Sequence, residues 1–197
     1  MNEEFDIEEL LKKSGAFLEG HFLLSSGMHS PHYYEKFRLL ENPQFNSLVA
    51  EEIAKNFNEK PVDVVASAAV GGILLAYELA RCFNVRCVFA ERVEGDLTLR
   101  RGFQIDPDEN VLLVEDIVTT GGSVLELYDV IQKTGAEISG IGIIVDRSNG
   151  LFNPDVEWSA LYTAAVENYQ PDECPLCAKG VPMTTRGRTG KTKKNAE

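Results

Sequence analysis

Two adjacent carboxylates followed by small hydroxyl-bearing and glycine residues have the clearest chemical character in this sequence. The segment is VLLVEDIVTTGGS, in which apolar residues lead into Glu115 and Asp116 and then into a loop at 119–123. Glycines let a backbone fold so that several N–H groups point at one anion, and hydroxyl groups add further donors. A phosphate fits such a loop, whereas carboxylates suit hydroxyl groups or the water shell of a metal ion. The segment predicts a ligand with both a phosphate and a sugar diol.

Other phosphate-binding patterns do not match the chain. TGKT at 189–192 comes close to a Walker loop, but Thr185 stands where that pattern requires glycine, and no strand precedes it. GIGIIV at 140–145 lacks the third glycine of a dinucleotide fingerprint. An ordinary strand–turn–helix connection remains the alternative for 115–123, and the adjacent acids count against it.

The elements that must position this loop alternate along the chain. Strands that are nearly continuous in valine, isoleucine and leucine, separated by helices, indicate a parallel sheet covered on both faces. The predicted fold class is therefore α/β, with a central, mostly parallel sheet flanked by helices. We expect strands at 62–68, 85–92, 110–118, 138–148 and 156–165, and helices at 71–83 and 122–135.

The N-terminal part has a different pattern. Asp6 can cap a helix at 5–17, and Asn42 before Pro43 starts another helix at 42–57. Between them, GHFLLSSGMHSPHYY at 20–34 predicts two short extended pieces around a turn. Residues from about 168 onward predict an irregular tail.

Charge and composition limit the classes of function. The 197 residues suit a single domain with a sizeable core, and the net charge of −12 argues against a nucleic-acid partner. Five lysines and arginines in 183–197 predict a flexible basic tail, for which RNA binding is a weak alternative. No apolar run is long enough for a membrane span, and the acidic start does not resemble a signal peptide. We expect a cytoplasmic protein without a membrane or nucleic-acid partner.

The four cysteines form two pairs, Cys82 with Cys87 and Cys174 with Cys177. CPLC at 174–177 has the spacing of a zinc knuckle, but a zinc site needs four ligands and no second pair stands nearby in the sequence. A dimer would supply two such pairs. We favour a surface turn with two reduced thiols.

Three segments with chemical character follow predicted strands. They are SAAVGG at 67–72, EDIVTTGGS at 115–123 and DRSNG at 146–150. In open α/β sheets, ligands bind beyond the carboxyl ends of the strands. We therefore expect these three segments to meet at one site.

The apolar strand, the two acids and TTGGS together resemble the phosphoribosyl pyrophosphate (PRPP) site of type I phosphoribosyltransferases. GHFLLSSGMHSPHYY at 20–34 and VDRS at 145–148 make the chain similar to the orotate phosphoribosyltransferases, and CPLCAKGVP at 174–182 occurs in some members. The resemblance covers about residues 8–182. It implies a type I phosphoribosyltransferase fold in a single domain, 1–182, with a small N-terminal hood at about 1–40 and a core at about 41–167.

The resemblance implies roles for the acidic pair and the loops. The carboxylates would hold the ribose hydroxyls of PRPP, the 119–123 loop its 5-phosphate, and SAAVGG its pyrophosphate. The implied PRPP-binding residues are Glu115, Asp116, Ile117, Val118, Thr119, Thr120, Gly121, Gly122, Ser123, Gly71 and Gly72.

The resemblance also implies an orotate site. Arg147 would grip the orotate carboxylate, because a guanidinium fork matches a carboxylate at two points. Thr119 would lie near the base, and Tyr33 and Tyr34 would flank it. A surface ion pair is the alternative for Arg147, and a place in the core is the alternative for the tyrosines.

AERVEGDLTLRRGF at 90–103 resembles the mobile loop that closes over the site in this family. Arg92, Arg100 and Arg101 would meet the pyrophosphate as charge develops on it and, with Asp116, form the implied catalytic set. A solvated β-hairpin is the alternative. The sequence departs from many members, which carry a lysine at Gly71 and a lysine and a histidine in the mobile loop.

The implied reaction transfers the phosphoribosyl group of PRPP to orotate, giving orotidine 5′-monophosphate and pyrophosphate in pyrimidine biosynthesis. Mg²⁺ would be held through PRPP and water, without direct protein ligands, and relatives are homodimers with shared active sites. A purine phosphoribosyltransferase and a non-catalytic PRPP-binding regulator are the alternatives. The first would not need Arg147 for a carboxylate, and the second usually has a basic DNA-binding region.

Overall fold

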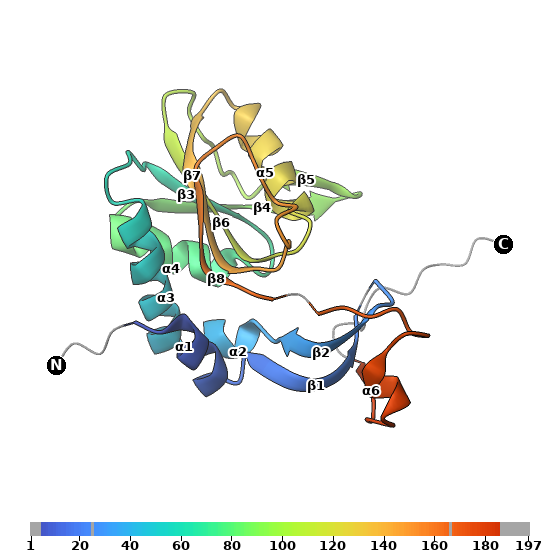
Figure 1. Cartoon of the computed structure of the whole chain (residues 1–197). Helices are drawn as coiled ribbons and strands as arrows, with labels where there is room; N and C mark the ends of the chain where they lie inside the picture. Colours follow the sequence, from blue (N-terminus) through green and yellow to red (C-terminus); the bar gives the residue numbers. More distant parts are fainter. Residues whose placement is uncertain (1–4, 25, 166, 186–197) are drawn as a thin grey trace.

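A six-stranded sheet forms the centre of the computed structural model, which describes residues 5–24, 26–165 and 167–185 (Figure 1). The strand order is β5-β4-β3-β6-β7-β8, and every neighbouring pair is parallel except β4 with β5. The strands are β3 (Val64–Ala68), β4 (Arg86–Val93), β5 (Asp96–Leu99), β6 (Asn110–Val118), β7 (Glu137–Asp146) and β8 (Trp158–Thr163). The α/β prediction with a mostly parallel sheet is confirmed.

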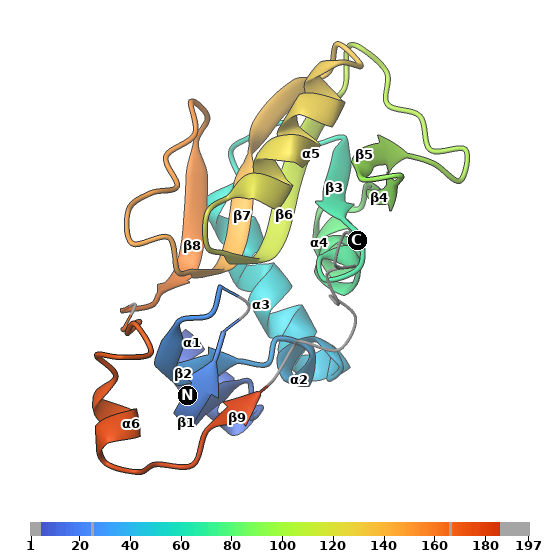
Figure 2. The same ribbon diagram turned by 90° about the vertical axis from the view of Figure 1, so that its right-hand side faces the viewer.

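Helices cover both faces of this sheet because its central strands are apolar on both sides. Leu112 and Val114 of β6 pack into one core with α3 (Pro43–Asn56) and α4 (Ile73–Phe83). Val111 and Leu113 point the other way, into a second core with α5 (Gly122–Gln132). Successive side chains of a strand face opposite sides, so a continuous apolar run serves both layers. Figure 2 shows α5 on one face and α3 and α4 on the other.

The N-terminal residues form a separate small layer, which we call the hood. It contains α1 (Ile7–Lys13), β1 (Phe17–Leu23), β2 (His29–Tyr34) and α2 (Phe37–Leu40). Asp6 Oδ1 accepts hydrogen bonds from the N–H groups of Glu8 and Glu9 at 2.9 and 3.1 Å, so the expected cap is present. Asn42 caps α3 in the same way, from Gln44 N–H at 3.0 Å.

The C-terminal segment is more ordered than the sequence predicts. It forms α6 (Pro175–Ala178) and β9 (Thr184–Thr185), and β9 joins β1 in a three-stranded sheet, order β2-β1-β9. The prediction of an irregular tail from 168 was wrong, because these residues gain backbone partners from the hood that are distant in the sequence. His29 and Tyr169, for example, exchange two backbone hydrogen bonds of 2.9 and 2.8 Å. Most of the predicted basic tail, 186–197, lies outside the described residues.

The carboxyl ends of β3, β6 and β7 lie side by side in the sheet, as the register of the parallel pairs requires. The three chemically distinctive loops therefore start from one edge, as expected. No helix among residues 5–24, 26–165 and 167–185 combines the length and the apolar content that a membrane crossing requires.

Candidate functional site

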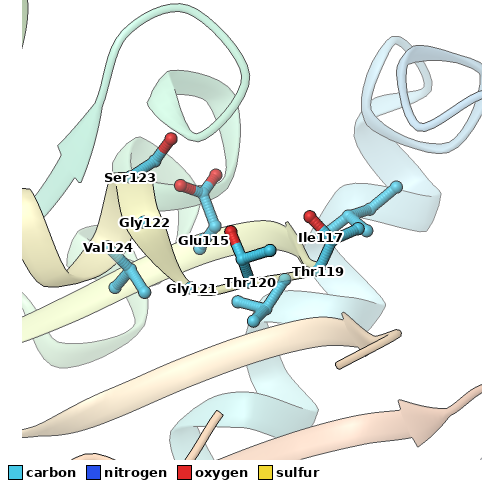
Figure 3. Close-up of a pocket in the computed structure, with 9 residues that line it drawn as sticks. Glu115, Ile117, Thr119, Thr120, Gly121, Gly122, Ser123 and Val124 are labelled. Atoms are coloured by element: carbon cyan, nitrogen blue, oxygen red, sulfur yellow. The ribbon is translucent and has the colours of Figure 1, made fainter. Parts of the chain in front are cut away.

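The loop between β6 and α5 forms a small polar pocket at the edge of the sheet. Glu115 and residues 117–124 line it, and Figure 3 shows the Glu115 carboxylate beside the first turn of α5. Gly121 has φ of +79°, and a Cβ at this position would overlap the Phe152 ring. The loop conformation therefore requires glycine at 121. Backbone N–H groups at the start of a helix favour an anion at this pocket.

Asp116 follows Glu115 in β6 but is not among the residues that line the pocket, and it is almost completely buried, with 1% of its surface exposed. Its Oδ1 accepts a hydrogen bond from Ile117 N–H at 2.6 Å, and its Oδ2 lies 2.6 Å from Nζ of Lys36. Lys36 comes from the hood, between β2 and α2. A buried carboxylate without a partner is costly, so this ion pair both neutralises Asp116 and joins the hood to the core.

Glu115 is also buried, with 8% of its surface exposed. Loss of water around the carboxyl group raises its pKa to about 8, the neighbouring charge of Asp116 acts in the same direction, and Lys36 opposes them. Its Oε1 accepts a hydrogen bond from Asp116 N–H at 3.2 Å. The two acids therefore have different environments: Asp116 is ion-paired, and Glu115 holds its proton more tightly than an exposed acid.

The SAAVGG segment follows β3 and lies against the acidic pair. A Cβ at Gly71 would overlap both Asp116 Oδ2 and Lys36 Nζ. A Cβ at Gly72 would lie 2.8 Å from Cβ of Ser67. Glycine at 71 lets the backbone approach the ion pair closely, and glycine at 72 lets it pack against Ser67; close backbone approach is the property that a loop for a bulky anion needs. The Ala69–Val70 peptide bond in this segment is cis.

Arg147 follows β7 and lies next to the end of β6, where the loop at 119–123 begins. Its backbone N–H donates to the carbonyl of Val118 at 2.7 Å, and its guanidinium carbon lies 5.2 Å from the centre of the Tyr34 ring. Burial lowers the pKa of Arg147. The guanidinium therefore stacks on an aromatic ring of the hood, beside the pocket, and no ion pair joins it to another of the described residues.

The aromatic pair divides between two environments. Tyr34 is 8% exposed, and burial together with Tyr162 raises its pKa above the usual range. Tyr33 is half-buried, and its ring centre lies 5.5 Å from that of Phe22. Adjacent residues of a strand point to opposite faces, and Tyr34 is the one whose ring packs against the Arg147 guanidinium.

The predicted mobile loop forms the β4–β5 hairpin, and its arginines lie in different surroundings. Arg92 donates to Glu126 of α5 at 3.0 Å and forms an ion pair with it. Arg101 pairs with Glu91 of the same hairpin at 2.9 Å, and Arg100 is exposed. The structure does not place these arginines in the pocket.

The remaining residues predicted to bind PRPP lie together at the pocket. Thr119, Thr120, Gly122 and Ser123 line the pocket with Ile117. Val118 also lines it, but its side chain is 2% exposed and its carbonyl accepts from Arg147 N–H, so it contributes through its backbone.

Sequence reasoning missed two features. Lys36 was not singled out, although it stands only two residues after the aromatic pair. The interpretation of CPLC as a surface turn was also incomplete: Cys174 is 3% exposed, His21 lies against both cysteines, and His29 lies against Cys177. These two histidines flank the predicted turn of the hood, so their approach to each other could have been inferred from the hairpin.

Comparisons with known proteins agree with this geometry. Residues 38–170 match the phosphoribosyl transferase domain family. The chain is 46% identical over 187 residues to the orotate phosphoribosyltransferase of Desulforamulus reducens, covering 95% of this chain and 97% of that protein. It is 45% identical over 182 residues to the enzyme of that name from Pelotomaculum thermopropionicum, covering 92% and 96%. The crystal structure of orotate phosphoribosyltransferase from Aeropyrum pernix superposes with a TM-score of 0.66 at 25% identity, covering 80% and 93%.

Proposed function

This chain belongs to the orotate phosphoribosyltransferases of the phosphoribosyl transferase domain family, and on that premise we propose how its site performs the reaction. The protein transfers the phosphoribosyl group of PRPP to orotate, with orotidine 5′-monophosphate and pyrophosphate as products. The observation that carries the assignment of substrate is Arg147, which stacks on Tyr34 beside the phosphate loop. A buried guanidinium at this place suits a planar carboxylate such as that of orotate.

The phosphate loop binds the PRPP 5-phosphate. Backbone N–H groups of 119–123 and the hydroxyls of Thr119, Thr120 and Ser123 are the donors. Glu115 and Asp116 accept hydrogen bonds from the ribose hydroxyls at the base of the pocket. Gly71 and Gly72 leave room for the pyrophosphate to approach Lys36. Lys36 then leaves Asp116 and binds the pyrophosphate, and the ribose hydroxyls replace it as the partner of Asp116.

Orotate binds between Arg147 and the hood. The guanidinium fork holds the carboxylate, and the Tyr34 ring fixes the plane of the arginine. Tyr33 and Thr119 complete the walls. This arrangement presents the orotate ring nitrogen to C1 of a ribose held over the acidic pair, so the main contribution of the protein is to position the two reactants.

Charge stabilisation accompanies departure of pyrophosphate from C1. Positive charge builds on the ribose as the bond to pyrophosphate breaks, and the charged carboxylate of Asp116 stabilises it, whereas Glu115 contributes as a hydrogen-bonding group. Arg92, Arg100 and Arg101 stabilise the developing negative charge on pyrophosphate once the β4–β5 hairpin closes. Arg92 must leave Glu126 to do so.

Mg²⁺ is the proposed cofactor, and the pocket fits an ion that arrives with its substrate. Mg²⁺ keeps several waters and is bound through one or two carboxylates together with substrate phosphates. Within the described residues, the one group of three or more potential ligands lies between the hood and the segment around α6, and none of its members lines this pocket. Glu115 and Asp116 would hold the ion through PRPP and water, and the bound ion would supply charge neutralisation at the pyrophosphate.

We also propose a homodimer with shared active sites, in a single domain over 1–182. Val70, Leu74 and Tyr77 are 71%, 45% and 68% exposed at and after the pyrophosphate loop, and such an apolar patch suits a protein partner. A cytoplasmic location agrees with the four free thiols, because the cytosol keeps thiols reduced.

A competition experiment tests the substrate assignment. The protein is given PRPP, Mg²⁺ and an equimolar mixture of orotate, adenine, hypoxanthine and uracil, and the nucleotides formed are identified by mass spectrometry. We expect orotidine 5′-monophosphate alone. A purine nucleotide as the main product would favour the purine phosphoribosyltransferase alternative, and no product would favour a PRPP-binding regulator.

A further inference from the structure

Four side chains that bind soft metals converge where the hood meets the C-terminal segment, outside the site described above. They are His21 of β1, His29 of β2, and Cys174 and Cys177 around α6. One ligand atom from each lies within 4.8 Å of all the others. Figure 2 shows the segment that carries α6 and β9 alongside the β1–β2 hairpin.

The distances match the edges of a tetrahedron around a metal ion. His21 Nε2 lies 3.1 Å from His29 Nδ1, 3.6 Å from Cys174 Sγ and 3.7 Å from Cys177 Sγ. Cys177 Sγ lies 3.3 Å from His29 Nδ1. Zinc bonds of ~2.0–2.1 Å to nitrogen and ~2.3 Å to sulfur place neighbouring ligands roughly 3.3–3.8 Å apart in tetrahedral geometry.

Hydrogen bonding alone does not account for this convergence. His21 Nδ1 lies 2.8 Å from the carbonyl of Val181, a contact that places its proton on Nδ1 and leaves a single lone pair on Nε2. Three groups, His29 Nδ1 and both thiols, face that one lone pair. A cation at the centre satisfies all four groups at once. The Val181 carbonyl then has the role of the outer partner that orients a metal-bound histidine.

The surroundings favour a closed, structural site. His21, His29 and Cys174 are 3%, 5% and 3% exposed, and Cys177 closes the cluster on its exposed side. The cluster offers two sulfurs and two imidazoles in a tetrahedral arrangement, and its cysteines have C-x₂-C spacing. Such a ligand set favours zinc over Mg²⁺, which prefers oxygen ligands. We propose that this chain binds one Zn²⁺ through His21, His29, Cys174 and Cys177, and that the ion fastens the segment 167–185 to the hood.

Binding converts both thiols to thiolates and releases their two protons to solvent, so no oxidant or reductant takes part. All four coordination positions belong to the protein, which leaves none for a substrate. The role of the ion is therefore structural: it links two segments whose direct backbone pairing is limited to short stretches such as β9 with β1 and His29 with Tyr169.

Metal analysis of the full-length chain, prepared without a histidine tag and under reducing conditions, tests the proposal. After reconstitution with zinc sulfate and removal of excess metal, we expect about one zinc per chain in the wild type and almost none in Cys177→Ser. Cys177 is exposed, so this variant should fold. Cys82→Ser is the matched control, because Cys82 lies outside the cluster, and it should retain wild-type zinc.

Two further readouts decide the geometry and the role. Cobalt(II) in place of zinc should give the strong visible absorption of a tetrahedral thiolate site in the wild type and Cys82→Ser, and not in Cys177→Ser. Zinc should raise the Tm of the wild type and of Cys82→Ser, and should not raise that of Cys177→Ser. Equal zinc content in Cys177→Ser and Cys82→Ser, or a wild type that retains no zinc, would overturn the proposal.

Discussion

Nζ of Lys36 lies 2.6 Å from Oδ2 of Asp116, so the hood contributes a cation directly to the acidic pair of the core. The carboxylate side chain is 2% exposed and the lysine side chain 34%. In the mechanism that we propose, this ion pair neutralises Asp116 before substrate binds; the ribose hydroxyls of PRPP then bind Asp116, and its pyrophosphate binds Lys36.

A double-mutant cycle on this pair separates its structural and functional roles. Lys36→Met leaves a buried carboxylate without its partner and should lower the free energy of unfolding by about 1–3 kcal/mol, a discounted value because the lysine is partly exposed. Adding Asp116→Asn should restore most of that loss. Denaturant unfolding of all four proteins measures the coupling, and strictly additive effects would show that the pair is not coupled.

The same Asp116→Asn variant should be severely impaired in catalysis. Loss of the carboxylate removes the acceptor for the ribose hydroxyls and the charge beneath C1, so kcat/KM for PRPP should fall by about 10²-fold or more. Asp129→Asn, a change at an exposed acid of α5, is the control. Near-normal activity of Asp116→Asn would remove the acidic pair from the mechanism.

Arg147 should discriminate between the two substrates. Arg147→Ala should raise the KM for orotate far more than that for PRPP, and Arg147→Lys should recover little of the loss because an ammonium lacks the two-pronged fork. Steady-state kinetics with each substrate varied in turn measures both constants. Arg38→Ala removes an exposed arginine that pairs with Glu41 and should change neither constant. An equal rise for orotate and PRPP would mean that Arg147 is structural.

Glu115 should make stability depend on pH. Its folded pKa of about 8 lies above the value of about 4.3 in an unfolded chain, so its contribution is fully present below pH 4.3 and is lost as pH rises through 8. Glu115→Gln cannot ionise. The Tm of the variant relative to wild type should therefore increase between pH 5 and pH 9. A difference in Tm that stays constant over this range would show that Glu115 has an ordinary pKa.

Arg92 and Glu126 form an ion pair whose two partners should behave differently in catalysis. If Arg92 stabilises departing pyrophosphate, Arg92→Ala should lower kcat by about 10²-fold. Glu126→Gln frees the arginine and should leave kcat at or above the wild-type value. Single-turnover rates at saturating PRPP make the comparison. Similar losses in both variants would indicate that the pair serves only to hold β5 against α5.

The sequence predicted what depends on local pattern. Apolar runs identified every parallel strand of the central six-stranded sheet, and Asp6 and Asn42 marked the starts of α1 and α3 because capping involves residues two or three positions apart. The acidic pair and TTGGS located the pocket because the residues that line it are close together in the sequence, at 115 and 117–124.

Contacts between distant segments were beyond this kind of reasoning. The pairing of Lys36 with Asp116 requires the hood to fold over the core, and no local signal specifies that arrangement. The contact of His21 with Cys174 spans 153 positions, so two unremarkable sequence features become a four-ligand cluster only in the folded chain. The short strand β9 depends in the same way on the presence of β1.

Loss of orotate ultraviolet absorbance after addition of the protein, PRPP and Mg²⁺ tests the central claim most directly, with adenine, hypoxanthine and uracil as parallel acceptors. We predict turnover of orotate alone, dependent on both PRPP and Mg²⁺. Tight binding of PRPP without turnover of any base would contradict the account and would indicate that this fold senses PRPP without consuming it.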